Sequence, residues 1–138
     1  MFIRQIKLAN ELDLPILIHM RDATLDTLEI LKEYPCKGIM HCYSGSLESA
    51  KILLNLGYYI SFATNALFSK KHKKNIKAVP LENMLTETDS PYLSPIKGEP
   101  NQPSNIKMTI ERIERTKHID FEEIEKQTEK NAIQVYNL

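Results

Sequence analysis

The chain has 138 residues, and its 18 Lys and Arg side chains balance its 18 Asp and Glu side chains. At about 100–200 residues per domain, residues 1–138 make one domain or a piece of a larger one. A hydrophobic content of 42% and a charged content of 26% exclude general disorder. The net charge of zero argues against a strongly basic nucleic-acid module, although it allows a locally charged site.

Targeting signals are not apparent in the sequence. No apolar run approaches the roughly 20 residues that span a bilayer, and the start at Met1–Arg4 does not have the pattern of a signal peptide. Cys36 and Cys42 form neither a CxxC pair nor a disulfide framework. These features predict a cytoplasmic protein with no membrane partner.

Apolar spacing and chain-breaking residues divide the sequence into alternating helices and strands. In chain order we expect a helix at 2–13, a strand at 14–19, a helix at 24–31, a strand at 37–41, a helix at 46–57, a strand at 58–62, a helix at 69–77 and a strand within 81–89. A proline-rich loop at 90–105 precedes two further helices at 106–117 and 121–136. Ser46 and Asp120 are expected to cap helices, and Gly57 to end one.

Short apolar strands that alternate with amphipathic helices are typical of parallel βαβ units. The predicted strands end at His19, at His41, at Phe62 and near Asp89, which is a nearly even spacing. Four such strands fit a small doubly wound sheet or half of an eight-stranded barrel. Periodicity alone does not choose between these folds.

Three of the predicted strands close with a residue that can ligate a metal, namely His19, His41 and Asp89. In parallel α/β folds, ligands bind at the carboxyl ends of the strands because the loops there converge. Two imidazoles and a carboxylate at that edge indicate a divalent-metal site for Zn, Mn or Mg. A lone His is more simply a satisfied polar residue at a strand end, but two at equivalent positions favour the metal.

Other polar residues admit both a functional and a structural interpretation. Arg21 could bind a phosphate with its planar guanidinium, or it could pair with Asp22 at the start of a helix. The lysine-rich run at 70–74 could contact nucleic acid, but a solvated helix face is the favoured interpretation. His72 and His118 lie in charged helical stretches and are expected at the surface.

Four segments of the sequence are distinctive in combination, namely Leu14-Pro-Ile-Leu-Ile-His-Met-Arg-Asp-Ala23, Met40-His-Cys-Tyr-Ser-Gly-Ser46, Tyr59-Ile-Ser-Phe62 and Leu85-Thr-Glu-Thr-Asp-Ser-Pro-Tyr-Leu93. Together they resemble the TatD family of metal-dependent hydrolases. The match extends from Phe2 to Leu138, and the two His segments followed by the last segment are a highly specific combination. Members of this family are (β/α)8 barrels, commonly with two divalent ions, and many are deoxyribonucleases that cleave phosphodiester bonds.

The resemblance implies a role for each candidate site residue. His19 and His41 are metal ligands, and Asp89 is both a ligand and the general base. In the functional hypothesis that follows from it, Arg21 and the loop around Tyr92 position the phosphate of the substrate. The implied cofactors are divalent metal ions.

The sequence departs from the family pattern near its start. The family normally opens with a strand that carries a His-x-His pair, followed later by a strand that ends in a metal-bridging Glu, and neither occurs here. The resemblance therefore implies an α/β fold that is the C-terminal half of a TIM (β/α)8 barrel, with about four parallel strands plus helices. A smaller departure is Asn101-Gln-Pro103, where the family more often has Asn-Glu-Pro.

A metal-dependent hydrolase that cleaves phosphodiester bonds in DNA is the leading functional hypothesis. The alternatives are a non-catalytic remnant that acts as an interaction module, and a metal-dependent hydrolase of C–N bonds. Half a barrel has open strand edges and one bare sheet face. We therefore expect a partner, either a second copy of the chain or a complementing N-terminal half, unless the terminal helix at 121–136 folds over the bare face.

Overall fold

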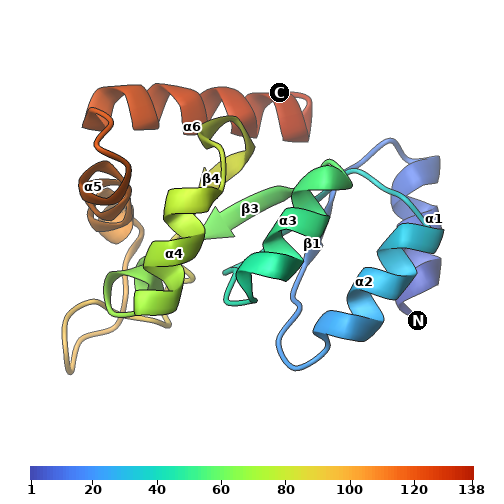
Figure 1. The fold of residues 1–138 in the computed structure, drawn as a ribbon, viewed down its shortest axis with the longest axis horizontal. Helices are drawn as coiled ribbons and strands as arrows, with labels where there is room; N and C mark the ends of the chain where they lie inside the picture. Colours follow the sequence, from blue (N-terminus) through green and yellow to red (C-terminus); the bar gives the residue numbers. More distant parts are fainter.

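A parallel sheet of four strands in the order β1-β2-β3-β4 forms the centre of the computed structural model, which describes residues 1–138 (Figure 1). In chain order, the elements are α1 (Phe2–Glu11), β1 (Ile16–Ile18), α2 (Thr24–Glu33), β2 (Gly38–Met40), α3 (Leu47–Asn55), β3 (Tyr59–Phe62), α4 (Lys70–Ala78), β4 (Met84–Thr86), α5 (Ile106–Lys117) and α6 (Phe121–Tyr136). Short 3₁₀ helices lie at Thr64–Leu67, Leu81–Asn83 and Pro103–Asn105. Every helix and strand expected from the sequence is present, and all strand pairs are parallel, which confirms the α/β fold class. None of the helices combines the length and the apolarity needed to cross a bilayer.

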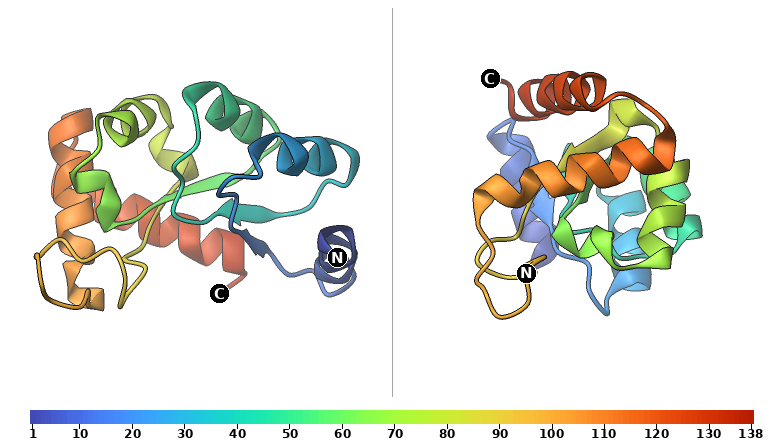
Figure 2. Two further views of the ribbon diagram at one scale, coloured as in Figure 1. Left: turned by 90° about the horizontal axis from the view of Figure 1, so that it is seen from below. Right: turned by 90° about the vertical axis from the view of Figure 1, so that its left-hand side faces the viewer.

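The sheet face that carries α2, α3 and α4 forms the main core. Figure 2 shows these three helices along one side of the sheet. Successive side chains of a strand point to opposite faces, and even-numbered ones such as Ile18, Met40 and Ile60 join the largest apolar cluster together with Leu31 and Leu53 of the helices. Burying each such side chain stabilises the fold by about 1.5–3 kcal/mol. This packing holds the helix layer on the sheet.

The opposite face of the sheet is covered over part of its area by α6 (Figure 2). Val135 of α6 packs against Ile39 of β2 and Leu85 of β4 in a second, smaller apolar cluster. Asn131 fixes the helix there, because its Nδ2 donates to the main-chain carbonyls of Leu81, in the 3₁₀ helix before β4, and of Met84, at the start of β4, each at 2.8 Å. The cover stops short of β1, where Leu17 is 54% exposed. Of the two arrangements expected for the bare face, the terminal helix therefore supplies part of the cover.

The predicted caps are confirmed for α3 and wrong in one detail for α6. Ser46 Oγ accepts a hydrogen bond from the Ser49 N–H at 3.1 Å, as an N-cap serine does. Asp120 occupies the N-cap position of α6, but its side chain makes no cap hydrogen bond. Instead, the Phe121 N–H donates to Glu114 Oε1 at 3.2 Å. A carboxylate from the preceding helix thus replaces the local cap.

The expected surface position is right for His118 and wrong for His72. His118 is exposed at the end of α5, whereas His72 is only 7% exposed. His72, Asn75 and Ile76 are three and four residues apart, so they form the buried face of α4 while the lysines around them stay exposed. Asn75 Nδ2 also donates to the Gly45 carbonyl at 3.0 Å. The lysine-rich sequence of α4 therefore also contains a buried face, and this face anchors the helix to the loop after β2.

Truncating Val135 tests the contribution of α6 to the fold. We expect Val135→Ala to lower the free energy of unfolding by about 1–3 kcal/mol, because it removes buried methyl groups and leaves a cavity against β2 and β4. Ile133→Ala is the matched control, since Ile133 lies on the same helix and is 46% exposed. Urea denaturation measures both variants, and equal losses would contradict the packing role of Val135.

Replacing His72 tests its burial through the pH dependence of stability. Burial lowers the pKa of His72, and the nearby charge of Lys71 lowers it further, while the neighbouring Tyr43 carbonyl opposes the shift. The unfolded chain therefore takes up a proton at His72 near pH 6.5, before the folded chain does, and stability falls as the pH drops below that value. We expect His72→Leu to remove this loss, so that its stability relative to wild type rises from pH 7 to pH 5 by at most about 1.4 kcal/mol per pH unit. Parallel stability curves would contradict a buried neutral His72, and His118→Asn serves as the exposed control.

Candidate functional site

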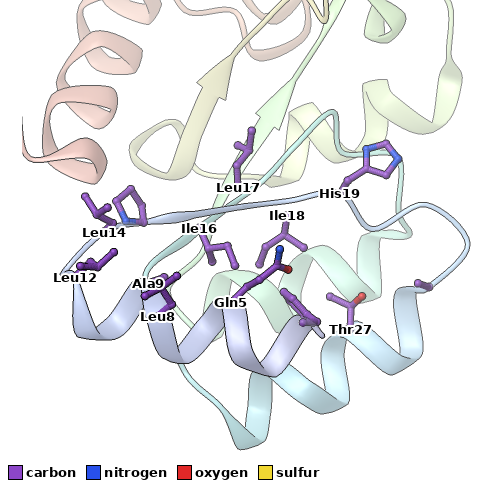
Figure 3. A pocket seen from close by; sticks show the side chains of 13 residues that line it. Gln5, Leu8, Ala9, Leu12, Leu14, Ile16, Leu17, Ile18, His19 and Thr27 are labelled. Atoms are coloured by element: carbon purple, nitrogen blue, oxygen red, sulfur yellow. The ribbon is translucent and has the colours of Figure 1, made fainter.

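The candidate site lies just beyond the carboxyl ends of β1, β2 and β4. His19 and His41 each follow the last residue of a strand by one position, and Glu87 and Asp89 follow β4. All four have odd numbers, so they continue the face that points away from the α2–α4 layer. Figure 3 shows this for β1, where His19 and Leu17 project to the side opposite Ile16.

His41 is the centre of the site because it lies between two carboxylates. Its Nδ1 is 2.9 Å from Glu87 Oε2, and its Nε2 is 3.3 Å from Asp89 Oδ1. The ring of His19 lies alongside, with its centroid 5.6 Å from that of His41 and the planes inclined by 38°. The structure therefore brings the three predicted ligands into one neighbourhood, with His41 and Asp89 closest together.

Glu87 is a site residue that the sequence interpretation missed. Besides contacting His41, its Oε1 accepts a hydrogen bond from the Cys42 N–H. That N–H faces Glu87 because Cys42 adopts a left-handed backbone conformation, with φ of 45°. The signal was available in the sequence, because a residue two positions before Asp89 shares its face of an extended chain.

The hydrogen bonds of His41 depend on which of its ring nitrogens carries a proton. When Nδ1–H donates to Glu87, the Nε2 lone pair faces the Asp89 carboxylate at 3.3 Å. Two acceptor atoms that face each other at this distance need a proton or a cation between them. A histidine whose second nitrogen is held by a carboxylate is also the usual form of a metal-bound histidine.

The spacing of the donor atoms fits a divalent ion for two of the predicted ligands. Two atoms that each lie about 2.0–2.2 Å from one tetrahedral ion are roughly 3.3–3.5 Å apart, and Nε2 of His41 and Oδ1 of Asp89 are 3.3 Å apart. No group of three His, Cys, Asp or Glu side chains is arranged closely enough to hold an ion by itself. His41 and Asp89 thus offer a pair of ligands, and His19 would have to move toward them to complete a set of three.

Asn101 holds the loop that carries Asp89. It is 5% exposed, and its Nδ2 lies 2.8 Å from the Thr88 carbonyl and 2.7 Å from the Tyr92 carbonyl. Its main-chain N–H donates to the Pro91 carbonyl at 2.9 Å. The departure from the family pattern at Gln102 falls on an exposed side chain beside this anchor.

The two predicted phosphate-binding residues differ in their placement. Arg21 lines a cleft of about 470 Å³ whose wall also includes His19 and His41. Tyr92 lies outside this cleft with its side chain 71% exposed, and its main-chain N–H donates to the Asp89 carbonyl at 2.9 Å. The structure therefore brings Arg21 to the histidines and does not bring the Tyr92 side chain there.

Cys42 is not suited to act as a nucleophile in this site. Burial raises the pKa of its thiol to about 11, and the charges of Glu87 and Asp89 add to the effect. The thiol therefore stays protonated at neutral pH, whereas the thiolate is the reactive form. The chemistry of the site rests on its imidazoles and carboxylates.

Comparisons with known proteins match this geometry to one family. The family model described as TatD related DNase matches residues 1–137. An uncharacterized metal-dependent hydrolase of Bacillus subtilis, YabD, is 42% identical over an alignment of 144 positions, which covers 99% of this chain and 56% of the relative. The human deoxyribonuclease TATDN3 is 36% identical over 135 residues, which cover 97% of this chain and 49% of that protein.

A solved structure shows the same fold over nearly the whole chain. The crystal structure of YJJV, a TatD homolog from Escherichia coli, superposes with a TM-score of 0.91 at 28% sequence identity. The superposition covers 97% of this chain and 54% of that one. The chain spans about half the length of the relatives it matches and corresponds to their C-terminal portion. It therefore belongs to the TatD family of metal-dependent hydrolases, of whose TIM barrel it contains about half.

Proposed function

We propose that this chain supplies the histidines and the acidic residues of the active site in a hydrolase that cleaves phosphodiester bonds of DNA. The observation that carries the proposal is the position of His41 between Glu87 and Asp89, with His19 alongside. The family model is described as a DNase, and a human relative is named a deoxyribonuclease, which supports DNA as the substrate.

His19, His41 and Asp89 would hold the divalent ion, which is Zn, Mn or Mg in this proposal. Such an ion, when bound, lowers the pKa of water and polarises a phosphoryl oxygen. Glu87 keeps the proton on Nδ1 of His41, so that Nε2 presents its lone pair to the site. The Asp89 carboxylate accepts the proton of the attacking water, and the Arg21 guanidinium binds the phosphate oxygens. The loop that carries Tyr92 borders the substrate.

We further propose that a complementing N-terminal half of the barrel covers the free edge of β1. A groove of about 570 Å³ runs between α1 and β1, and it is lined mainly by apolar side chains (Figure 3). Three of them, Leu12, Leu14 and Leu17, are each more than half exposed. An exposed strand edge beside an apolar groove is a surface on which a further parallel strand would pair and bury these residues. A second copy of the chain is the alternative occupant.

Metal binding is the first test of the proposed ligands. We expect the chain to bind Zn²⁺ or Mn²⁺, and His41→Ala to weaken that binding at least about tenfold, because it removes the donor nearest to Asp89. Isothermal calorimetry measures the affinity, and His118→Asn is the control because His118 is exposed on α5, away from the site. Equal affinities of wild type and the His19/His41 double alanine variant would contradict the assignment.

Loss of hydrolysis in an Asp89 variant is the second test. In the chain reconstituted with the N-terminal half of a TatD relative, we expect Asp89→Asn to reduce cleavage of single-stranded DNA by at least about 10²-fold. Asparagine keeps the shape of the side chain, so the melting temperature should stay unchanged. It cannot accept the proton, so a loss of rate without a loss of stability would implicate the chemistry. A substrate panel that includes amides separates phosphodiester from C–N bond hydrolysis. Undiminished turnover by Asp89→Asn would exclude Asp89 as the base.

A further inference from the structure

The cleft that His41 lines carries more basic than acidic side chains. Arg21 and Lys71 both line it together with His19 and His41, whereas Glu87 and Asp89 do not. Most of the other lining groups are polar, and the one lining carboxylate is that of Asp22, next to Arg21. The site therefore combines carboxylates, suited to a cation, with a basic cleft, suited to an anion.

Lys71 reaches this cleft from a fixed part of α4. Its neighbour His72 is buried, and Asn75 Nδ2 donates to the Gly45 carbonyl at 3.0 Å, so the start of α4 is tied to the loop after β2. The first turn of α4 contains no acidic residue, although negative charge is favoured there. The positive charge of Lys71 thus adds to the positive end of the helix dipole at the wall of the cleft. The lysine itself is exposed and has no ion-pair partner.

Arg21 supplies the second positive charge that lines the cleft. It follows His19 by two residues in the loop between β1 and α2, and no carboxylate forms an ion pair with it. Arg21 lines the cleft together with Cys42, the residue that follows His41.

Asn65 adds an amide to the wall of this cleft. Its Nδ2 contacts Cys42 Sγ at 3.3 Å, and its Oδ1 is buried without a hydrogen-bond partner. Asn65 thus forms part of the cleft wall beside Cys42.

We propose that this cleft is a second phosphate subsite, in which Lys71 binds the phosphate that neighbours, along a DNA strand, the scissile phosphate bound by Arg21. The inference rests on the proposed function, because it places the cleaved phosphate at His41 and Asp89. Lys71 is the new residue, and its role is to position the substrate. In this proposal Lys71 contacts the substrate, while the other lysines at the start of α4 remain exposed to solvent.

Binding of two nucleotides that differ by one phosphate tests the subsite without any catalysis. We expect the chain, in a chelator and at low salt, to bind thymidine 3′,5′-bisphosphate about tenfold more tightly than thymidine 5′-monophosphate. Lys71→Gln should abolish most of this difference. Lys74→Gln, which changes another exposed lysine of α4 that does not line the cleft, should preserve it.

The outcomes separate the subsite from the proposed function. Equal effects of Lys71→Gln and Lys74→Gln, or no preference for the bisphosphate in wild type, would overturn the subsite. Because no metal is present in this assay, failure of metal binding or of hydrolysis contradicts the proposed function and leaves this measurement unaffected. A loss confined to Lys71→Gln supports the subsite.

Discussion

Parallel pairing of the four strands in register determines which side chains can meet. Leu17 lies opposite Ile39, and Ser61 lies opposite Leu85, so odd-numbered residues of all strands share one face. Even-numbered residues face α2, α3 and α4 and join the larger apolar cluster. Just past the strand ends, the odd positions continue as the residues of the candidate site. Stability and chemistry therefore use alternate residues of the same short segments.

The charges around His41 are of two kinds. Carboxylates from the segment after β4 contact both nitrogens of the imidazole, and the basic groups Arg21 and Lys71 line the cleft that the imidazole also lines. Carboxylates are suited to bind a metal ion, and positively charged side chains are suited to bind the phosphates of a nucleic-acid backbone. One histidine at a strand end is thus adjacent to both kinds of charge, although the whole chain carries no net charge.

Local patterns account for most of what the sequence could predict. Helices and strands were recognisable because apolar spacing reports burial of one face, and the histidines could be placed because each closes a strand. Glu87 is less apparent than Asp89 because it directly follows the last strand residue, where a polar side chain is also typical of an ordinary strand end. His72 was misplaced because flanking lysines mask a spacing of three and four residues. The cover supplied by α6 depends on packing between distant segments, which no local pattern encodes.

The tie between α4 and the loop after β2 has a consequence for how this protein can change over evolution. The Asn75 side chain holds the carbonyl of Gly45, and a side chain at position 45 would collide with the Tyr43 ring. Substitutions at these two positions therefore act on the same piece of backbone, and their effects should not add. A change at Asn75, on the buried face of α4, would alter which changes the loop after β2 tolerates. Substitutions in the loop that follows His41 are therefore expected to depend on which residue occupies position 75 of α4.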